Sequence, residues 1–423
     1  MLLRSRRVVI QGTVQPAAIQ IEDGVIAAIL PFESVDTPIT DAAILPGLVD
    51  THVHINEPGR AHWEGFETAT RAAAAGGVTT LIEMPLNSIP ATTSVAAYEQ
   101  KLAAGEGKLH VDTGFWGGVV PGNTAELGAM WRAGVFGFKC FLVPSGVDEF
   151  CDVGEEALRE AMPVLARLGA PLLVHAESPS YLPARPPESE CDAIAMMIRL
   201  SRETGARIHI VHLAAIEALP LIEDAQAAGV PISVETCPHY VFFGAHSEIP
   251  WLTPGVTTPA RKGGDLMHDN IFKCAPPIRG RLRPALPRIG MVVSDHSPSP
   301  PELKAGPYET AWGGIASLEL GLSAMTTIHD NLADLAQWMA KAPARLAGLS
   351  KKGRIAPGYD ADFVVFDPDA SWTVDSAKLH QRHKITPYAG RELRGRVRAT
   401  YLRGEKIYDD GVFAPASGHV LKR

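Results

Sequence analysis

Two histidines, His52 and His54, close a short apolar run in the segment Asp50-Thr51-His52-Val53-His54. Residues i and i+2 of a β-strand point to the same face, so the two imidazoles would lie side by side. Their Cα atoms would then be about 6–7 Å apart, a separation that suits shared binding of one metal ion. A His-x-His pair on its own is equally compatible with a structural role.

Three further residues of the same kind end later apolar runs. His175 ends Leu172-Leu173-Val174-His175, His212 ends Ile208-His209-Ile210-Val211-His212, and Asp295 ends Val292-Val293-Ser294-Asp295. Taken singly, each is typical of a hydrogen-bonded core histidine or a helix-capping aspartate. Four histidines and an aspartate that all end such runs favour one shared metal site instead, provided that the ends of the runs meet.

Lys139 lies inside the apolar run Gly137–Val143, which contains no acidic residue. A buried ammonium without a partner costs several kcal/mol and tends to lose its proton. One interpretation is a lysine at the end of a strand, with its head reaching towards solvent. The other is a neutral amine that has reacted with CO2 to give a carbamate, an anionic oxygen ligand able to bridge two metals.

The middle of the chain alternates apolar, β-branched runs with helical or irregular segments. Strands are expected at Ile44–Ile55, Val78–Met84, His110–Gly117, Gly137–Val143, Pro171–Glu177, Arg207–Leu213, Pro231–His239 and Met291–His296. Helical patterns between them include Glu64–Ala75, Glu155–Leu168, Asp192–Glu203 and Ile216–Ala228. This alternation predicts a parallel sheet, and eight strands predict a closed (β/α)8 TIM barrel, an α/β fold that carries its functional residues on the C-terminal rim. A doubly wound sheet is the alternative, and the placement of the histidines favours the barrel.

Both ends of the chain differ from the middle. Residues 1–43 and 353–423 contain short alternating strands separated by turns such as Asp23-Gly24 and Asp410-Gly411, without helices between them. This pattern predicts one small β-sandwich domain, assembled from both termini, beside a barrel of residues 44–352.

Composition excludes several classes of partner. The net charge of −8 and the lack of a basic stripe argue against nucleic acid. There is no stretch of about 18 apolar residues and no signal-peptide core at the N-terminus, so we expect no membrane association. Five scattered cysteines without a Cys-x-x-Cys motif favour a reducing, cytoplasmic location.

The segment Asp50–Arg60 resembles the metal motif of the amidohydrolase superfamily and, more narrowly, of the cyclic amidohydrolases: dihydroorotases, dihydropyrimidinases and allantoinases. Other segments are similar to allantoinases in particular, and the resemblance runs over nearly the whole chain. These segments are His62–Thr68, Gly76–Asn87, Gly137–Phe141, Glu235–Tyr240, Ala275–Arg279 and Val293–Pro298. Near the C-terminus, Lys352–Gly358 and Asp360–Phe363 resemble the segment in which the family returns to its sandwich.

The resemblance implies two divalent metal ions, most simply Zn²⁺, with Co²⁺, Mn²⁺ or Fe²⁺ as alternatives. It implies that His52, His54 and Asp295 bind one ion, that His175 and His212 bind the other, and that Lys139, carboxylated by CO2, bridges them. Asp295 would also move a proton from the attacking water to the leaving nitrogen, which makes it the expected catalytic residue. By analogy we expect a homo-oligomer, up to a tetramer.

Substrate choice follows from a missing arginine. Similar dihydroorotases bind the substrate carboxylate with an arginine two residues after the His-x-His pair, where this chain has Asn56. A bidentate arginine is the natural receptor for a carboxylate, so its loss favours an uncharged ring. We therefore predict that allantoin, a small-molecule substrate, is hydrolysed to allantoate. Asn56, Asn87 and Ser299 are candidate substrate contacts, although each also fits a loop or capping role, and Arg60 is expected to brace its loop.

Three other functions remain open: a hydantoinase or dihydropyrimidinase, a dihydroorotase, and a non-catalytic scaffold. A hydantoinase or dihydropyrimidinase would usually have a tyrosine in the loop after the lysine strand, and Leu142–Gly146 has none. A non-catalytic scaffold would have lost metal ligands, and all six are present here. The segment Ser178–Ser189 is shorter than allantoinases usually have at this place, which bears on the shape of the pocket.

Overall fold

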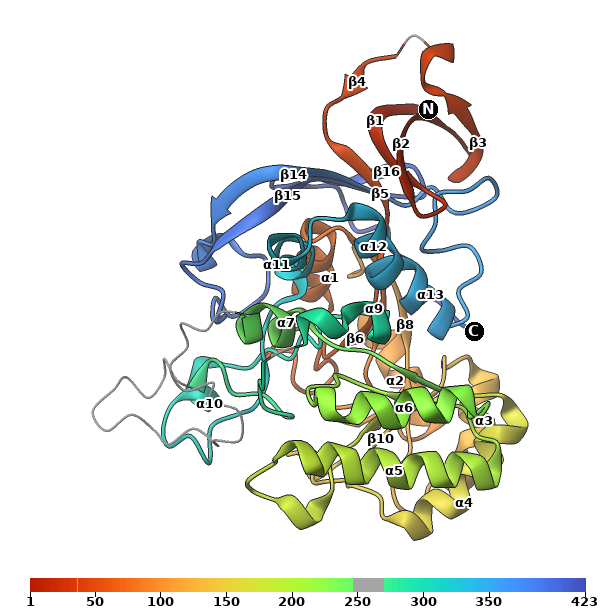
Figure 1. The fold of residues 1–423 in the computed structure, drawn as a ribbon, viewed down its shortest axis with the longest axis vertical. Coiled ribbons are helices and arrows are strands. Elements are labelled where there is room, and N and C mark those ends of the chain that lie inside the picture. The colour runs from red at the N-terminus through yellow and green to blue at the C-terminus, as the bar shows by residue number, and fades with distance from the viewer. Residues whose placement is uncertain (36, 246–269, 281) are drawn as a thin grey trace.

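Eight parallel segments form a barrel in the centre of the molecule (Figure 1). The computed structural model describes residues 1–35, 37–245, 270–280 and 282–423. One side of the barrel is the parallel sheet β6 (Leu48–Val53), β7 (Val78–Glu83) and β8 (Asp112–Phe115). The other side is the parallel sheet β9 (Gly117–Gly118), β10 (Phe138–Phe141), β11 (Leu172–His175), β12 (Ile208–Ile210) and β13 (Ile232–Val234).

Trp116 alone separates β8 from β9, so these two strands act as one interrupted strand of the barrel. On the opposite side, parallel bridges join Thr236 to Val292 and Val53 to His296, which connects β13 to β6 through residues 291–296. The ring is thus closed, and the predicted (β/α)8 barrel is confirmed.

Helices cover the outside of the barrel because each has one apolar face. In α4 (Glu155–Leu168), the buried residues Leu158, Ala161, Met162 and Leu165 recur every three or four positions, and Gly169 ends the helix in the left-handed conformation. The other described α-helices are α1 (Phe66–Ala75), α2 (Val95–Gly105), α3 (Leu127–Ala133), α5 (Pro187–Thr204), α6 (Leu219–Ala227), α7 (Pro238–Ala245), α9 (Leu286–Ile289), α10 (Pro301–Lys304), α11 (Gly321–Ile328), α12 (Leu332–Ala336) and α13 (Ala342–Leu346).

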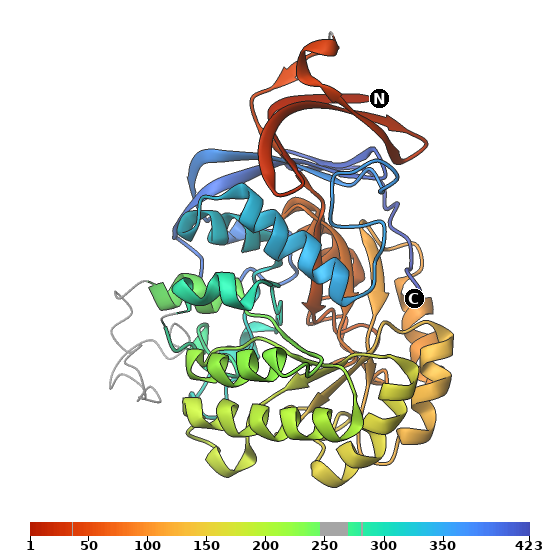
Figure 2. The same ribbon diagram turned by 45° about the vertical axis from the view of Figure 1, so that its right-hand side comes forward.

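A nine-stranded sheet combines both ends of the chain, in the order β17-β16-β15-β14-β5-β1-β2-β3, with β4 beside β1. The sheet curls, and its N-terminal strands stand above β14 and β15 (Figure 2). The molecule therefore has the expected β-sandwich part built from both termini, while the division at residues 43/44 and 352/353 stays a prediction. Its strands are β1 (Leu2–Ile10), β2 (Thr13–Glu22), β3 (Val25–Pro31), β4 (Ile39–Thr40), β5 (Ala43–Pro46), β14 (Phe363–Thr373), β15 (Glu392–Leu402), β16 (Glu405–Asp409) and β17 (Val412–Phe413).

The prediction of one strand over Ile44–Ile55 is wrong. The segment forms β5, which pairs with β1 and β14, and β6, which belongs to the barrel. The break falls at Gly47, where a Cβ atom would lie 2.3 Å from the Thr79 hydroxyl oxygen. At the same point the Gly47 N–H donates to the Asp362 carbonyl at 2.8 Å, so the chain turns from one sheet to the other.

Two further predicted strands are too long. The segment Pro231–His239 ends as a strand at Val234, and Pro238 begins α7. Residues 291–296 make only single bridges, because the Val292 N–H donates to the Trp338 carbonyl and the Ser294 N–H to Asp50. The backbone of this segment is held by side chains and a neighbouring helical segment, in addition to the barrel.

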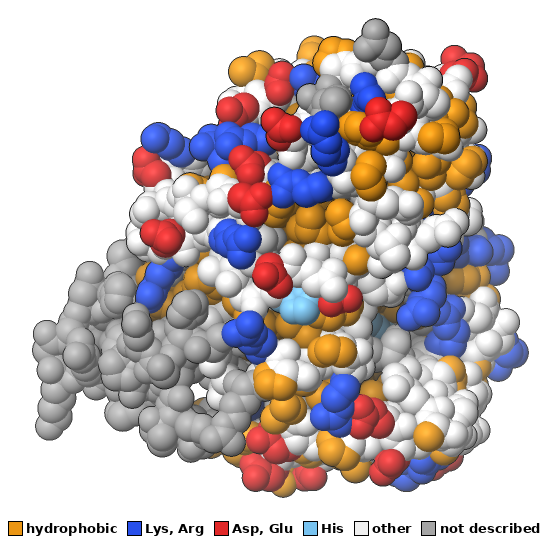
Figure 3. Space-filling view, turned by 45° about the horizontal axis from the view of Figure 1, so that its top comes forward, with side chains coloured by type: hydrophobic (Ala, Val, Ile, Leu, Met, Phe, Trp, Pro, Cys, Tyr) orange, Lys and Arg blue, Asp and Glu red, His pale blue; other side chains and the backbone are white. Residues whose placement is uncertain are grey.

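Charged side chains of both signs are interspersed over most of the face seen in Figure 3, with a group of Lys and Arg at its right-hand edge. Within the described ranges, no helix is both long enough and apolar enough to cross a bilayer.

Candidate metal centre

The six predicted metal ligands lie together at the C-terminal ends of the barrel strands. His52 belongs to β6, Lys139 to β10 and His175 to β11, while His54, His212 and Asp295 follow within a few residues of a strand or bridge. None of the six is more than 8% exposed. The rim of the barrel therefore brings together residues that are as much as 243 positions apart, from His52 to Asp295.

His52, His54 and Asp295 form one half of the centre. The Asp295 Oδ1 atom lies 3.2 Å from His52 Nε2 and 3.5 Å from His54 Nε2. These three residues have donor atoms within 4.8 Å of one another, an arrangement that suits a divalent cation. Burial alone would raise the pKa of Asp295, but the nearby His52 and a hydrogen bond with His54 outweigh it and hold that pKa below its ordinary value.

His175 and His212 form the other half. Their ring centroids are 4.6 Å apart, and the His212 ring is 5.3 Å from that of His52, which links the two halves. Phe141 stacks on His175 with a centroid separation of 4.6 Å and fixes the plane of its ring. Burial lowers the pKa of both histidines, which favours the neutral imidazole that binds metals.

Lys139 is fully buried, and its Nζ atom has no hydrogen-bond partner among the described residues. Its charge acts on His52 in one half and on His175 and His212 in the other. Burial lowers the pKa of this amine to about 8, although Asp295 and Glu235 oppose the shift. A buried amine without a partner is costly unless it is modified or bound. This orphaned nitrogen, near three of the imidazoles and the Asp295 carboxylate, fits a centre for two divalent ions with a ligand between them.

Two buried glutamates orient the histidines, and sequence reasoning missed both. Glu235 accepts from His52 Nδ1 at 2.6 Å and from His209 Nε2 at 2.9 Å, which leaves His52 Nε2 facing Asp295. Glu177 lies 2.7 Å from His175 Nε2 and is also paired with Arg185. Carboxylates of this kind fix the ring orientation of metal-binding histidines and raise their basicity. The signal was an acidic residue directly after an apolar run, in Ile232-Ser233-Val234-Glu235.

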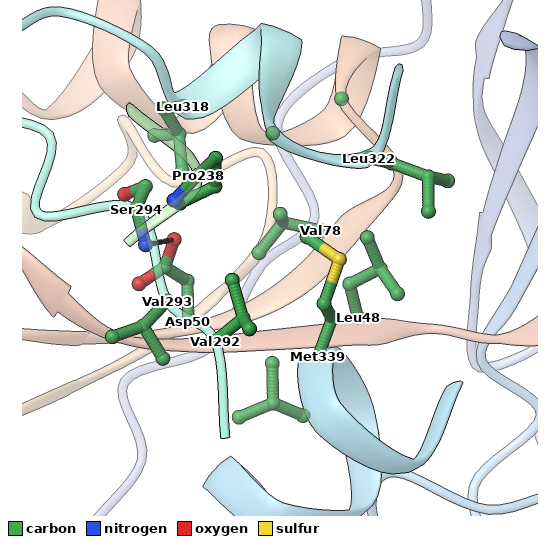
Figure 4. A pocket seen from close by; sticks show the side chains of 13 residues that line it. Leu48, Asp50, Val78, Pro238, Val292, Val293, Ser294, Leu318, Leu322 and Met339 are labelled. Carbon is green, nitrogen blue, oxygen red and sulfur yellow. Dashed lines mark hydrogen bonds between the residues drawn. The ribbon is translucent and has the colours of Figure 1, made fainter. Parts of the chain in front are cut away.

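Asp50 ties together the two segments that carry His52 and Asp295. Its carboxylate accepts from the His52 N–H and the Ser294 N–H, each at 3.0 Å. Figure 4 shows the hydrogen bond between Ser294 and Asp50 at the edge of a largely apolar pocket. The pocket is lined by residues such as Leu48, Val78 and Met339 and by none of the six predicted ligands. Burial raises the pKa of Asp50 to about 7. The pocket thus adjoins the metal centre without including its ligands, and Asp50 holds the backbone of His52 and of the segment before Asp295.

Three non-glycine residues of the rim have left-handed backbone conformations: Asn56 (φ 68°), His212 (φ 40°) and Asp295 (φ 44°). Such conformations are uncommon for residues with a Cβ atom and cluster at functional sites. At His212 and Asp295, this conformation occurs where the side chain joins the other residues of the centre.

The three candidate substrate contacts lie near one another. Asn87 Nδ2 donates to Asn56 Oδ1 at 3.2 Å, Asn56 Nδ2 donates to the Pro298 carbonyl at 3.4 Å, and the buried Ser299 hydroxyl has no partner among the described residues. Arg60 donates to the Asn87 carbonyl at 2.6 Å and pairs with Glu149, so the expectation that it braces its loop is confirmed. Whether the three polar residues touch a substrate stays a prediction.

Comparisons with known proteins agree with this geometry. Residues 43–407 match the Amidohydrolase family. The chain is 44% identical to an allantoinase of Streptomyces avermitilis, covering 100% of this chain and 98% of that protein. It is 42% identical to an allantoinase of Saccharomyces cerevisiae, covering 99% and 98%. Among solved structures, an L-hydantoinase (dihydropyrimidinase) from Arthrobacter aurescens superposes with a TM-score of 0.88 at 28% identity, covering 100% of this chain and 99% of that one. The chain therefore belongs to the amidohydrolase family and, within it, to the group that contains the allantoinases.

Proposed function

We propose that this chain opens the hydantoin ring of allantoin by hydrolysis of a cyclic amide C–N bond, giving allantoate. The observation that carries the proposal is full-length similarity to proteins named allantoinases from bacteria, yeast and plants, at 37–44% identity. The six metal-ligand positions expected of such an enzyme are all present and meet at one rim.

The charge of the rim supports an uncharged substrate. Asn56, to which Asn87 donates a hydrogen bond at 3.2 Å, occupies the position at which similar dihydroorotases have an arginine. Three described arginines near the rim are already paired with carboxylates: Arg60 with Glu149, Arg185 with Glu177 and Arg279 with Glu190. An unpaired substrate carboxylate would have to be desolvated among these residues at a cost of several kcal/mol.

We propose that the centre holds two Zn²⁺ ions, one with His52, His54 and Asp295 and the other with His175 and His212. Lys139 would bridge them as a carbamate: its neutral nitrogen attacks CO2, a N–C bond forms, and the nitrogen loses a proton to solvent. When bound, the ions supply an activated water molecule and polarise the ring carbonyl.

Asp295 is suited to proton transfer. Its low pKa keeps it ionised at neutral pH, so it is able to accept the proton of the attacking water. An amide nitrogen is a poor leaving group and must be protonated as the ring C–N bond breaks. Asp295 is suited to deliver this proton because it lies at the end of the last barrel segment, beside His52 and His54.

A turnover panel tests the substrate. With one metal-loaded preparation, we expect kcat/KM for allantoin to exceed that for dihydroorotate by about a hundredfold or more, because each 1.4 kcal/mol of lost transition-state binding is about tenfold. Comparable rates, or a preference for dihydroorotate, would overturn the substrate while leaving the metal centre untouched.

Hydantoinase activity is the second candidate, since the L-hydantoinase structure is a full-length match. Hydantoin and dihydrouracil belong in the same panel, and faster turnover of either than of allantoin would favour this candidate. A non-catalytic scaffold would bind no metal, so metal analysis of the purified protein separates it from both enzymes.

We further propose that subunits assemble into a homo-oligomer, up to a tetramer, in the cytoplasm. All five cysteines are free, which agrees with a reducing compartment. Light scattering on the eluting protein would measure the number of subunits.

A further inference from the structure

A second group of metal-binding side chains shares Asp295 with the first. Cys237 and His239 offer a sulfur and a ring nitrogen that, with an Asp295 carboxylate oxygen, lie within 4.8 Å of one another. Both Cys237 and His239 are completely buried. Neither belongs to the six ligands of the proposed two-metal centre.

His239 is the unusual member of this group. Neither of its ring nitrogens has a hydrogen-bond partner among the described residues, although the side chain is fully buried. A buried imidazole without partners carries the full cost of its desolvation. A ring nitrogen of His239 is therefore available as a ligand for a metal ion.

The backbone holds the three residues in place. Cys237 directly precedes α7, and its carbonyl accepts from the Tyr240 N–H at 3.2 Å. Thr236 and Val293 are joined by a hydrogen bond of 3.1 Å, which places the start of α7 beside the segment that carries Asp295. The group is therefore organised before any ligand binds.

We propose that Cys237, His239 and Asp295 form an inhibitory site for a third, thiophilic divalent cation of the zinc class. Thiolate, imidazole and carboxylate are the ligands that Zn²⁺ takes from proteins, and a thiolate selects soft cations over Mg²⁺ or Ca²⁺. On binding, the Cys237 thiol loses its proton to solvent and a metal–sulfur bond forms.

Sharing Asp295 makes this third site inhibitory, an effect that rests on the proposed function. A cation that draws the Asp295 carboxylate towards Cys237 removes it from proton transfer. Two resident cations nearby repel a third, so the site fills last and only at excess metal.

Cadmium is the probe, added to protein that already holds two equivalents of metal. The readouts are the number of bound ions after dialysis and the ultraviolet charge-transfer absorption of a cadmium–thiolate bond. The six ligands of the two-metal centre are nitrogen and oxygen donors, so they give no such absorption. We expect a third equivalent together with the thiolate signal, and cadmium inhibition that rises with its occupancy.

Cys237→Ser should weaken this third equivalent at least tenfold and abolish its thiolate signal, and His239→Gln should weaken it as well. Cys274→Ser is the matched control, a buried cysteine outside the group, and should behave as the wild type. Inhibition is compared with each variant's own rate without cadmium. If Cys237→Ser does not fold by circular dichroism, His239→Gln carries the test.

A third equivalent and thiolate signal that persist in the Cys237 and His239 variants, or that never form in the wild type, would overturn the proposal. The spectroscopic result does not depend on turnover. It therefore remains decisive even if allantoin proves not to be the substrate.

Discussion

Lys139 is the residue proposed to link the two halves of the metal centre. It is fully buried and has no partner among the described residues, while imidazoles and Asp295 surround it. An ammonium at this position would repel two divalent cations, whereas a carbamate would attract both. The charge of this one side chain thus decides whether the site is able to hold metal.

Substitution Lys139→Ala should remove most of the bound metal and most of the turnover, because the bridging oxygen ligand is lost. Small carboxylic acids at high concentration should restore part of both, since they are able to occupy the space of the carbamate. Metal analysis and turnover with and without the acid measure this effect. His212→Ala is the control that the acid should not rescue, and an alanine variant at Lys139 that kept two metals and normal turnover would contradict the bridging role.

Asp295 is expected to act both as a ligand and in proton transfer, and Asp295→Asn separates the two roles. The amide oxygen is still able to bind a metal, but it cannot carry a proton at neutral pH. We therefore expect retained fold, much of the metal, and a kcat lowered by about 10²–10⁴-fold, the range for lost acid–base catalysis. Steady-state kinetics with measured metal content test this, and an unchanged kcat would remove Asp295 from the mechanism.

Glu235 joins three strands of the barrel at the level of the metal centre. It follows β13 and accepts hydrogen bonds from His52 on β6 and His209 on β12. Burial opposes its ionisation, but the nearby His209 and hydrogen bonds from His209 and His52 outweigh this and hold its pKa at about 2. The carboxylate is therefore ionised and aligns His52 for metal binding.

Substitution Glu235→Gln should weaken metal binding by about 10–100-fold, the usual effect of losing a carboxylate that orients a metal-binding histidine. Competition with a chelator measures the affinity of the loaded protein. Glu223→Gln, at an exposed position of helix α6, is the matched control and should leave the affinity unchanged. Equal affinities in the two variants would mean that Glu235 has no part in orienting His52.

The elements show how far sequence reasoning extends. The period of apolar residues predicted α4 at its observed bounds, because its buried face is a simple helical stripe. The alternation of strands and helices also predicted which residues would meet at the rim. Glu177 and Glu235 were missed because an acidic residue after an apolar run does not by itself reveal that it contacts a histidine. The partner of Glu235 on β6, His52, is 183 positions away. The break at Gly47 depends on Thr79 and Asp362, residues far along the chain that no local pattern reveals.

On the scale of the whole molecule, one ionic cluster joins the barrel to the terminal sheet. Lys352 Nζ lies 2.7 Å from Asp112, on barrel strand β8, and 2.7 Å from Asp362, which precedes β14 of the terminal sheet. Arg403, between β15 and β16, binds both oxygens of Asp112 at 2.6 Å, and the His419 N–H donates to the same carboxylate at 2.9 Å. The cluster therefore connects segments that are far apart in the sequence. The side chains of Lys352, Asp112 and Asp362 in this cluster are almost completely buried.

Substitution Lys352→Met should lower the free energy of unfolding at pH 7 by about 3–5 kcal/mol, because it leaves buried carboxylates without their shared cation. Burial would raise the pKa of Asp112, but Lys352 and Arg403 outweigh it and hold that pKa below 3.8. A carboxyl with a lowered pKa in the folded state contributes stability above pH 3.8, and this contribution is lost as the pH falls through the folded value. The difference in unfolding free energy between wild type and variant should therefore be largest at pH 7 and should narrow below about pH 4, where protonated carboxyls no longer need a cation.

Urea unfolding at both pH values measures this difference, with the exposed Lys378→Met as a control that leaves the midpoint unchanged. A difference that stays constant with pH would mean that Lys352 stabilises the junction by packing alone.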